Sequence, residues 1–151
     1  MRAAFWFIGT LLLTACGTDA SDPVAWSHLA IRHGWGPCEE GAVCVSTWTV
    51  TRGADGRPEA TIAALDKGIA KARTLEDADR DALAKLLDDA TFREGMASGF
   101  GCGQVLDYTV RFSLDLDDGT TQAQDVTGCV VEKLEGIGAL PRQVETLVVG
   151  S

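Results

Sequence analysis

The fold is decided by the stretch LDYTVRFSLDLD, residues 106–117, in which apolar and polar side chains alternate without interruption. The apolar positions are Leu106, Tyr108, Val110, Phe112, Leu114 and Leu116. Because successive side chains of a strand point to opposite faces, this alternation predicts a β-strand with one buried face and one face in water. Such a strand belongs to an antiparallel sheet whose buried face needs a cover.

The turn residues Asp118-Gly119 follow at once, and they predict a hairpin in which residues 120–131 return as a second strand. A two-residue turn and a bulged three-residue turn bring different returning residues inward, respectively Thr121 with Ala123 and Val126 with Val130. Sequence alone leaves both registers open. We favour the bulged register because it places Val126 opposite Val110 and Val130 opposite Leu106.

Three upstream segments have the composition of strands. Residues 27–33 alternate weakly and indicate a first strand at the edge of the sheet. Residues 43–52 are rich in Val, Thr and Trp, which fit a pleated surface. The Asp55-Gly56 turn then predicts a hairpin with residues 59–65.

Two amphipathic helices are expected to cover the sheet. The first follows the acidic residues Glu76 and Asp77, which suit the positive end of a helix dipole. Its apolar residues recur at helical spacing: Ala78, Ala82, Leu83, Leu86, Leu87 and Ala90. The second is a broken helix that starts near Leu134 and resumes at Pro141, a residue favoured in first turns. This order predicts an α+β fold, an antiparallel sheet of two hairpins and the edge strand packed on two helices.

The first sixteen residues have the parts of a secretory signal peptide. Arg2 precedes an apolar run over residues 3–13, and the segment ends in Leu-Thr-Ala-Cys, residues 13–16. The run is shorter than the roughly 20 apolar residues of a membrane-spanning helix. Its last four residues resemble the lipobox of bacterial lipoproteins. The resemblance implies cleavage before Cys16 and acylation of Cys16.

This interpretation sets the expected domain organisation: a signal peptide over residues 1–15, a lipidated cysteine and tether over residues 16–25, and one α+β domain over residues 26–151. Two or more acyl chains on Cys16 would hold that domain stably on the membrane. By resemblance to lipoprotein sorting, Gly17 in place of an aspartate favours the outer membrane. The sequence does not decide between its periplasmic and outer surfaces, nor does it predict an oligomeric state.

The charge balance excludes one class of partner. The chain has 13 basic and 22 acidic residues, a net charge of −9, and no basic stripe. Such a chain repels phosphate backbones, so we expect no nucleic acid as a partner.

Four cysteines remain when Cys16 is set aside, and an even number in an oxidising compartment predicts disulfides. Four cysteines allow three pairings, among which sequence does not choose. Closeness along the chain favours Cys38 with Cys44, and closeness at the open end of the predicted hairpin favours Cys102 with Cys129. Neither pair has the spacing of a zinc site, so we expect no metal and no cofactor.

The sequence contains no recognisable catalytic constellation. His28 and His33 are its two histidines, and five residues apart on a strand they face opposite sides. An enzyme would need one of them to converge with a distant carboxylate such as Asp107 or Glu132. A different kind of site would be an aromatic ligand groove lined by the tryptophans of the domain, Trp26, Trp35 and Trp48.

Three features resemble the many small, uncharacterised lipoproteins of Gram-negative bacteria: Gly36-Pro37-Cys38, the Leu-rich helix at residues 83–87, and Thr127-Gly128-Cys129 after the hairpin. The order of hairpins and helices is also similar to that of emfourin-type metalloprotease inhibitors. We therefore predict a non-enzymatic, lipid-anchored binding or structural module of the envelope with an envelope protein as partner. The alternative, implied by the second resemblance, is a protease inhibitor that presents residues 34–41 or 95–103.

Overall fold

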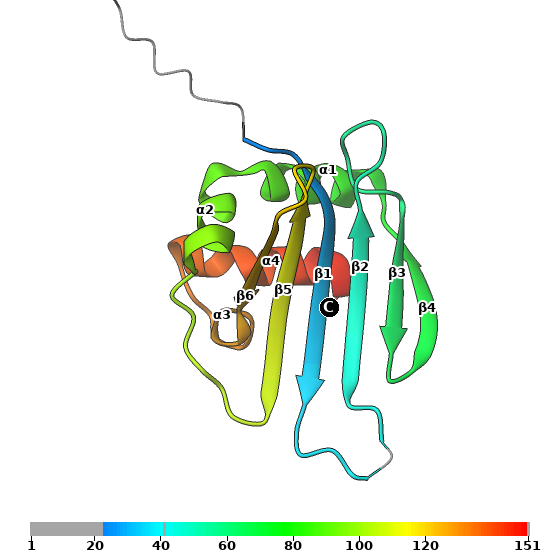
Figure 1. Ribbon diagram of the computed structural model, residues 1–151, viewed down its shortest axis with the longest axis vertical. Helices are drawn as coiled ribbons and strands as arrows, with labels where there is room; N and C mark the ends of the chain where they lie inside the picture. Colours follow the sequence, from blue (N-terminus) through cyan, green and yellow to red (C-terminus); the bar gives the residue numbers. More distant parts are fainter. Residues whose placement is uncertain (1–22, 41, 151) are drawn as a thin grey trace, which may run out of the picture.

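A computed structural model describes residues 23–40 and 42–150 (Figure 1), so Cys16 and the predicted signal peptide lie outside the described residues. Within these residues, six strands form one antiparallel sheet in the order β4-β3-β2-β1-β5-β6. The strands are β1 (Trp26–Trp35), β2 (Val45–Thr51), β3 (Thr61–Asp66), β4 (Ile69–Thr74), β5 (Tyr108–Leu116) and β6 (Thr121–Asp125). The helices are α1 (Asp77–Asp88), α2 (Ala90–Ser98), α3 (Thr127–Val131), the 3₁₀ turn η1 (Gly136–Ala139) and α4 (Leu140–Val149).

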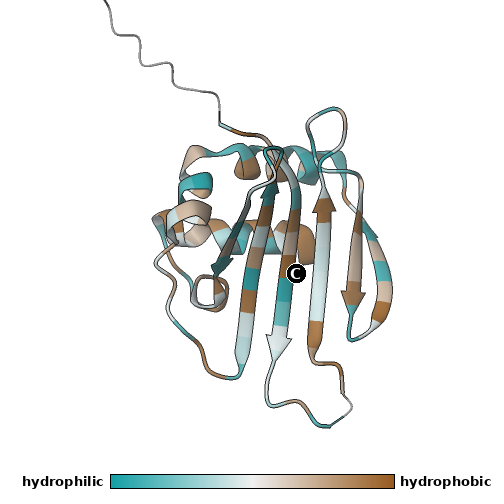
Figure 2. Cartoon of the chain, viewed as in Figure 1, coloured by the Kyte–Doolittle hydropathy of each residue, from teal (hydrophilic) through white to brown (hydrophobic). Residues whose placement is uncertain are grey.

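The α+β class is confirmed, and the helices cover one face of the sheet (Figure 1). The core between the two layers contains Trp26, Leu29, Ile31, Phe112, Leu83, Leu87, Val144 and Val148, all fully buried. The opposite face carries short or charged side chains, among them Thr49, Arg32 and Arg111. Figure 2 shows the resulting alternation of hydrophobic and hydrophilic residues along β1 and β5. In the described part of the chain, no helix is long and apolar enough to span a membrane.

β1 lies in the centre of the sheet, so its predicted place at the edge is wrong. It pairs with β2 on one side and with β5 on the other, where Leu29 lies opposite Leu114 and Ile31 opposite Phe112. The weak alternation of residues 27–33 indicates a strand but contains no information on how many neighbours that strand has. Its second neighbour, β5, comes from far along the chain.

The β5–β6 hairpin has the bulged register, with Phe112 opposite Gln124 and the Val126 N–H donating to the Val110 carbonyl at 2.8 Å. The predicted pairing of Leu106 with Val130 does not form. Leu106 precedes the strand and is 89% exposed. The returning strand ends early because the Val110 N–H donates to the Thr127 hydroxyl at 2.8 Å. This side-chain bond takes the place of the next backbone hydrogen bond between the two strands.

β4 is a strand that the sequence did not predict. The turn before it, Lys67-Gly68, has positive φ at both residues (49° and 79°), the geometry of a tight hairpin. Ile69–Thr74 contains one large apolar residue, Ile69, because this edge strand is exposed along most of its length. Its Arg73 guanidinium donates to the carbonyl oxygens of Leu147 and Val148, both at 3.0 Å, which ties the edge of the sheet to the last turn of α4.

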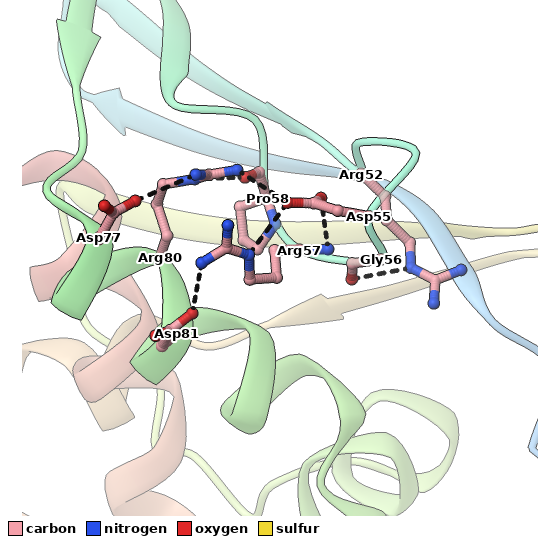
Figure 3. Close-up of polar contacts among 8 residues, drawn as sticks. All are labelled: Arg52, Asp55, Gly56, Arg57, Pro58, Asp77, Arg80 and Asp81. Atoms are coloured by element: carbon pink, nitrogen blue, oxygen red, sulfur yellow. Dashed lines mark hydrogen bonds and ion pairs between the residues drawn. The ribbon is translucent and has the colours of Figure 1, made fainter.

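The β2–β3 loop is fastened to α1 by two arginines (Figure 3). Arg80 donates to the Pro58 carbonyl at 2.9 Å, and Arg57 pairs with Asp81 at 2.9 Å. Both arginines also reach Asp55, whose pKa is lowered by hydrogen bonds from the Arg57 backbone and side chain. Polar contacts therefore hold the β2–β3 end of the sheet to α1. In Figure 1 the opposite end of the sheet extends beyond the helices.

Candidate functional site

Both disulfides form between the predicted partners, Cys38 with Cys44 and Cys102 with Cys129. Cys102 and Cys129 lie with their Cα atoms 5.0 Å apart, and Cys129, on α3, is fully buried in the core. Cys38 and Cys44 lie at the surface with Cα atoms 5.8 Å apart. This second bridge closes the loop between β1 and β2, and it limits the conformations available to that loop.

A hollow of about 580 Å³ lies between this loop and the segment that enters β5. It is lined by Gly34, Trp35, Gly36, Cys38, Ala42, Val43, Cys44, Val45, Asp107, Tyr108 and Thr109. Two backbone hydrogen bonds hold the walls: the Gly36 N–H donates to the Asp107 carbonyl at 3.1 Å, and the Trp35 N–H to the Cys44 carbonyl at 3.0 Å. Asp107 has φ of 63°, an uncommon conformation that Asp tolerates better than most residues. The hollow is therefore tied to the fold on both sides.

An aromatic cluster lies beside this hollow. Trp35 and Tyr108 are opposite each other in the β1–β5 pairing, and their ring centroids are 6.0 Å apart. The His33 ring lies 6.1 Å from Trp35, edge-on to it, and 6.0 Å from Tyr108. Trp35 is 39% exposed, and the Lys67 ammonium lies 5.8 Å from its ring centroid. The half-exposed rings offer a surface on which a flat or apolar group of a partner can stack.

Behind the aromatic cluster, α4 brings Glu145 to His33. His33 is only 5% exposed, and its Nε2 lies 3.5 Å from Glu145 Oε1 without a hydrogen bond to any described residue. Burial lowers the pKa of His33. Burial likewise raises the pKa of Glu145, against the opposing effect of Arg142, and burial together with Glu145 raises the pKa of Tyr108. Each of the three shifts favours the neutral form of its group.

The histidines face opposite sides of the sheet. His28 lies on the face without helices, with Nδ1 3.3 Å from Asp115 Oδ2, whereas His33 faces α4. The carboxylates beside the histidines are thus Asp115 and Glu145, and neither Asp107 nor Glu132 takes that place. The spacing of Glu145 contains a signal for its position: it comes four residues after buried Pro141 and three before buried Val148, on the inward face of α4. Among residues 23–40 and 42–150, no group of three or more His, Cys, Asp and Glu side chains could hold a metal ion.

The three tryptophans do not line one groove. Trp26 is fully buried at the far end of β1, and Trp48 packs against the core from β2. Only Trp35 reaches the hollow, and its aromatic partner is Tyr108, which the sequence did not suggest. The loop expected over residues 95–103 is also shorter than predicted, because Gly95 is buried inside α2.

No family model matches the chain, and neither curated proteins nor solved structures yield a match.

Proposed function

We propose that the protein is a lipid-anchored, non-enzymatic binding module of the cell envelope. In this proposal acylated Cys16 holds the domain on the membrane, and an envelope protein binds at the hollow beside the Cys38–Cys44 bridge. The observation that carries the binding surface is the half-exposed Trp35, stacked beside Tyr108 between two braced walls. Tryptophan and tyrosine dominate the energetics of protein interfaces when they become fully desolvated.

Two further features support this surface. Exposed apolar side chains gather around the cluster, with Val43 in the wall of the hollow and Leu106 just before Asp107 and Tyr108. Apolar side chains that are exposed together mark interaction sites more often than those that are scattered. The disulfide and the backbone bonds also order the walls before binding, so that association loses less conformational entropy.

A pull-down from envelope extract with the purified full chain tests the binding surface. We expect a specific protein partner, and Trp35→Ala should weaken its binding by tenfold or more, since truncating a central aromatic residue typically removes about 2 kcal/mol or more. Leu65→Ala is the control, because Leu65 is also an exposed apolar residue, lies on β3 and does not line the hollow. Equal retention of the partner by both variants would refute the proposed surface.

The anchor is tested separately. Labelled palmitate should be incorporated into the wild-type chain and not into Cys16→Ser, and the variant should leave the membrane fraction. If the wild-type protein takes up no label, the lipid anchor is excluded. That result would not bear on the proposed binding surface.

A protease inhibitor is the second candidate. The feature that favours it is the exposed, disulfide-closed loop between β1 and β2, because a constrained loop loses less conformational entropy on binding. Inhibition of an envelope metalloprotease by the purified chain, lost on replacing Cys38 and Cys44 by alanine, would favour this function over a structural module.

A further inference from the structure

A second hollow lies between α1 and α4, and it shares no lining residue with the hollow beside Trp35. It is a groove of about 880 Å³ lined by Ala82, Lys85, Leu86, Asp89, Lys133, Ala139, Leu140, Arg142, Gln143, Thr146 and Leu147. None of these residues is among the buried residues of the core. Leu86, Leu140 and Leu147 are half-buried and pack against the edge of the core, and the groove lies beside them.

The floor of the groove is apolar because the apolar stripe of each helix extends from the buried core to the surface. On α1, Leu83 and Leu87 are buried in the core while Leu86 turns to the groove. On α4, Leu140 and Leu147 turn to the groove, while Val144 and Val148 beside them are buried in the core. In the described chain nothing covers this second apolar surface.

The rim of the groove is positive in a chain of net charge −9. Lys85, Lys133 and Arg142 face one acidic residue, Asp89. None of the three cations lies within 4.0 Å of a carboxylate among the residues the structure describes. The first turn of α4 also lines the groove, and its helix dipole adds to the positive potential there. An apolar floor with unpaired cations at its rim is complementary to an anion with an apolar tail.

We propose that this groove binds a single-chain anionic amphiphile, a long-chain fatty acid in its carboxylate form, with the tail between α1 and α4 and the carboxylate among Lys85, Lys133 and Arg142. Its volume lies within the roughly 300–1,000 Å³ of small-molecule sites. The inference is independent of the binding surface proposed at Trp35.

Photo-crosslinking of the full chain with a diazirine analogue of palmitic acid tests the proposal. We expect labelled peptides from α1 and from the segment 133–149, and excess palmitate should abolish the labelling. A photoreactive lysophosphatidylcholine with the same acyl chain tests the charge requirement, because its headgroup is zwitterionic. It should label these peptides at least several-fold less.

Charge-reversal variants distinguish a built site from a sticky surface. Lys85→Glu with Arg142→Glu should lower labelling by about tenfold, because it replaces two attractions to the carboxylate with two repulsions. Arg32→Glu with Arg111→Glu makes the same charge change on the open face of the sheet, where the two arginines are opposite each other, and should label as the wild type does. Leu86→Gln should lower labelling by both probes, because it makes the floor of the groove polar.

Three outcomes would overturn the proposal: no labelled peptide in α1 or α4, equal labelling by the two probes, or full labelling of the double charge reversal. A concentration-dependent dimer that Leu86→Gln dissociates, without fatty-acid labelling, would assign the groove to a second copy of the chain instead.

Discussion

Gly128 allows the backbone of α3 to touch the backbone of the loop that precedes β5. Its N–H donates to the Gly103 carbonyl at 3.0 Å. A Cβ at this position would lie 2.6 Å from Gly103 N and 2.8 Å from Gly103 C, with the carbonyl oxygen closer still. The obstacle is backbone that the neighbouring Cys102–Cys129 disulfide holds in place, so no flexible side chain can move aside.

The expected effect of Gly128→Ala follows from three contributions. Separating the two segments weakens a hydrogen bond that contributes about 1 kcal/mol. Overpacking at a rigid contact costs about 1–3 kcal/mol. Alanine in a helix returns up to about 1 kcal/mol relative to glycine. The net loss in the free energy of unfolding is about 1–3 kcal/mol, and a domain of this size should lose about 4 °C of Tm per kcal/mol.

Gly103→Ala is the matched control, because it adds the same methyl group to the other side of the same contact. A Cβ at Gly103 meets no atom within 4 Å, so the variant should stay within about 0.5 kcal/mol of the wild type. Calorimetry of both oxidised variants compares them directly. If Gly128→Ala melts no lower than Gly103→Ala, the backbone contact does not constrain α3 and the reasoning is refuted.

Two further predictions concern His33 and the disulfides. Because burial lowers the pKa of His33, the unfolded chain takes up a proton below about pH 6.5 that the folded chain resists, so stability should fall as the pH drops through that range. Urea unfolding at several pH values should show that the free energy of unfolding falls less with decreasing pH in His33→Gln than in the wild type. His28→Gln is the control and should show the wild-type fall, since Glu145 and Tyr108 remain in both variants. An unchanged fall in His33→Gln would contradict the attribution to His33. Replacing Cys102 and Cys129 by alanine should cost about 3.5 kcal/mol, against about 2 kcal/mol for Cys38 and Cys44, because the bridges span 27 and 6 residues. The reverse order in equilibrium unfolding would show that the longer bridge constrains the unfolded chain less than its span implies.

The parts of the fold that could be predicted from the sequence depend on patterns of residues that are close together along the chain. The alternation through Phe112 predicts the buried face of β5, and the three-residue turn ending at Gly119, with φ of 83°, produces the pairing of Val110 with Val126. The buried positions of α1, Leu83 and Leu87, likewise follow from helical spacing. Each of these features depends on residues within a few turns or one hairpin of one another.

The parts that were missed depend on single side chains or on distant partners. Residues 126–131 have the composition of a strand, yet the Thr127 hydroxyl replaces the ladder bond at Val110 and the chain turns into α3. β4 has no run of large apolar residues, because it is an exposed edge strand that Arg73 ties to α4. Neither cause is visible in a periodic pattern.

The candidate site combines both kinds of information. The period of two places Trp35 and His33 on the same face of β1, and this much follows from sequence. Tyr108 joins them only through the pairing of β1 with β5, whose register is set by buried pairs such as Ile31 with Phe112. A slip of β1 by one residue would move every one of its core side chains to the open face and His33 with them. The hydrophobic pattern that specifies the fold therefore also positions the aromatic cluster, which is why the cluster could be located only after the strands were paired.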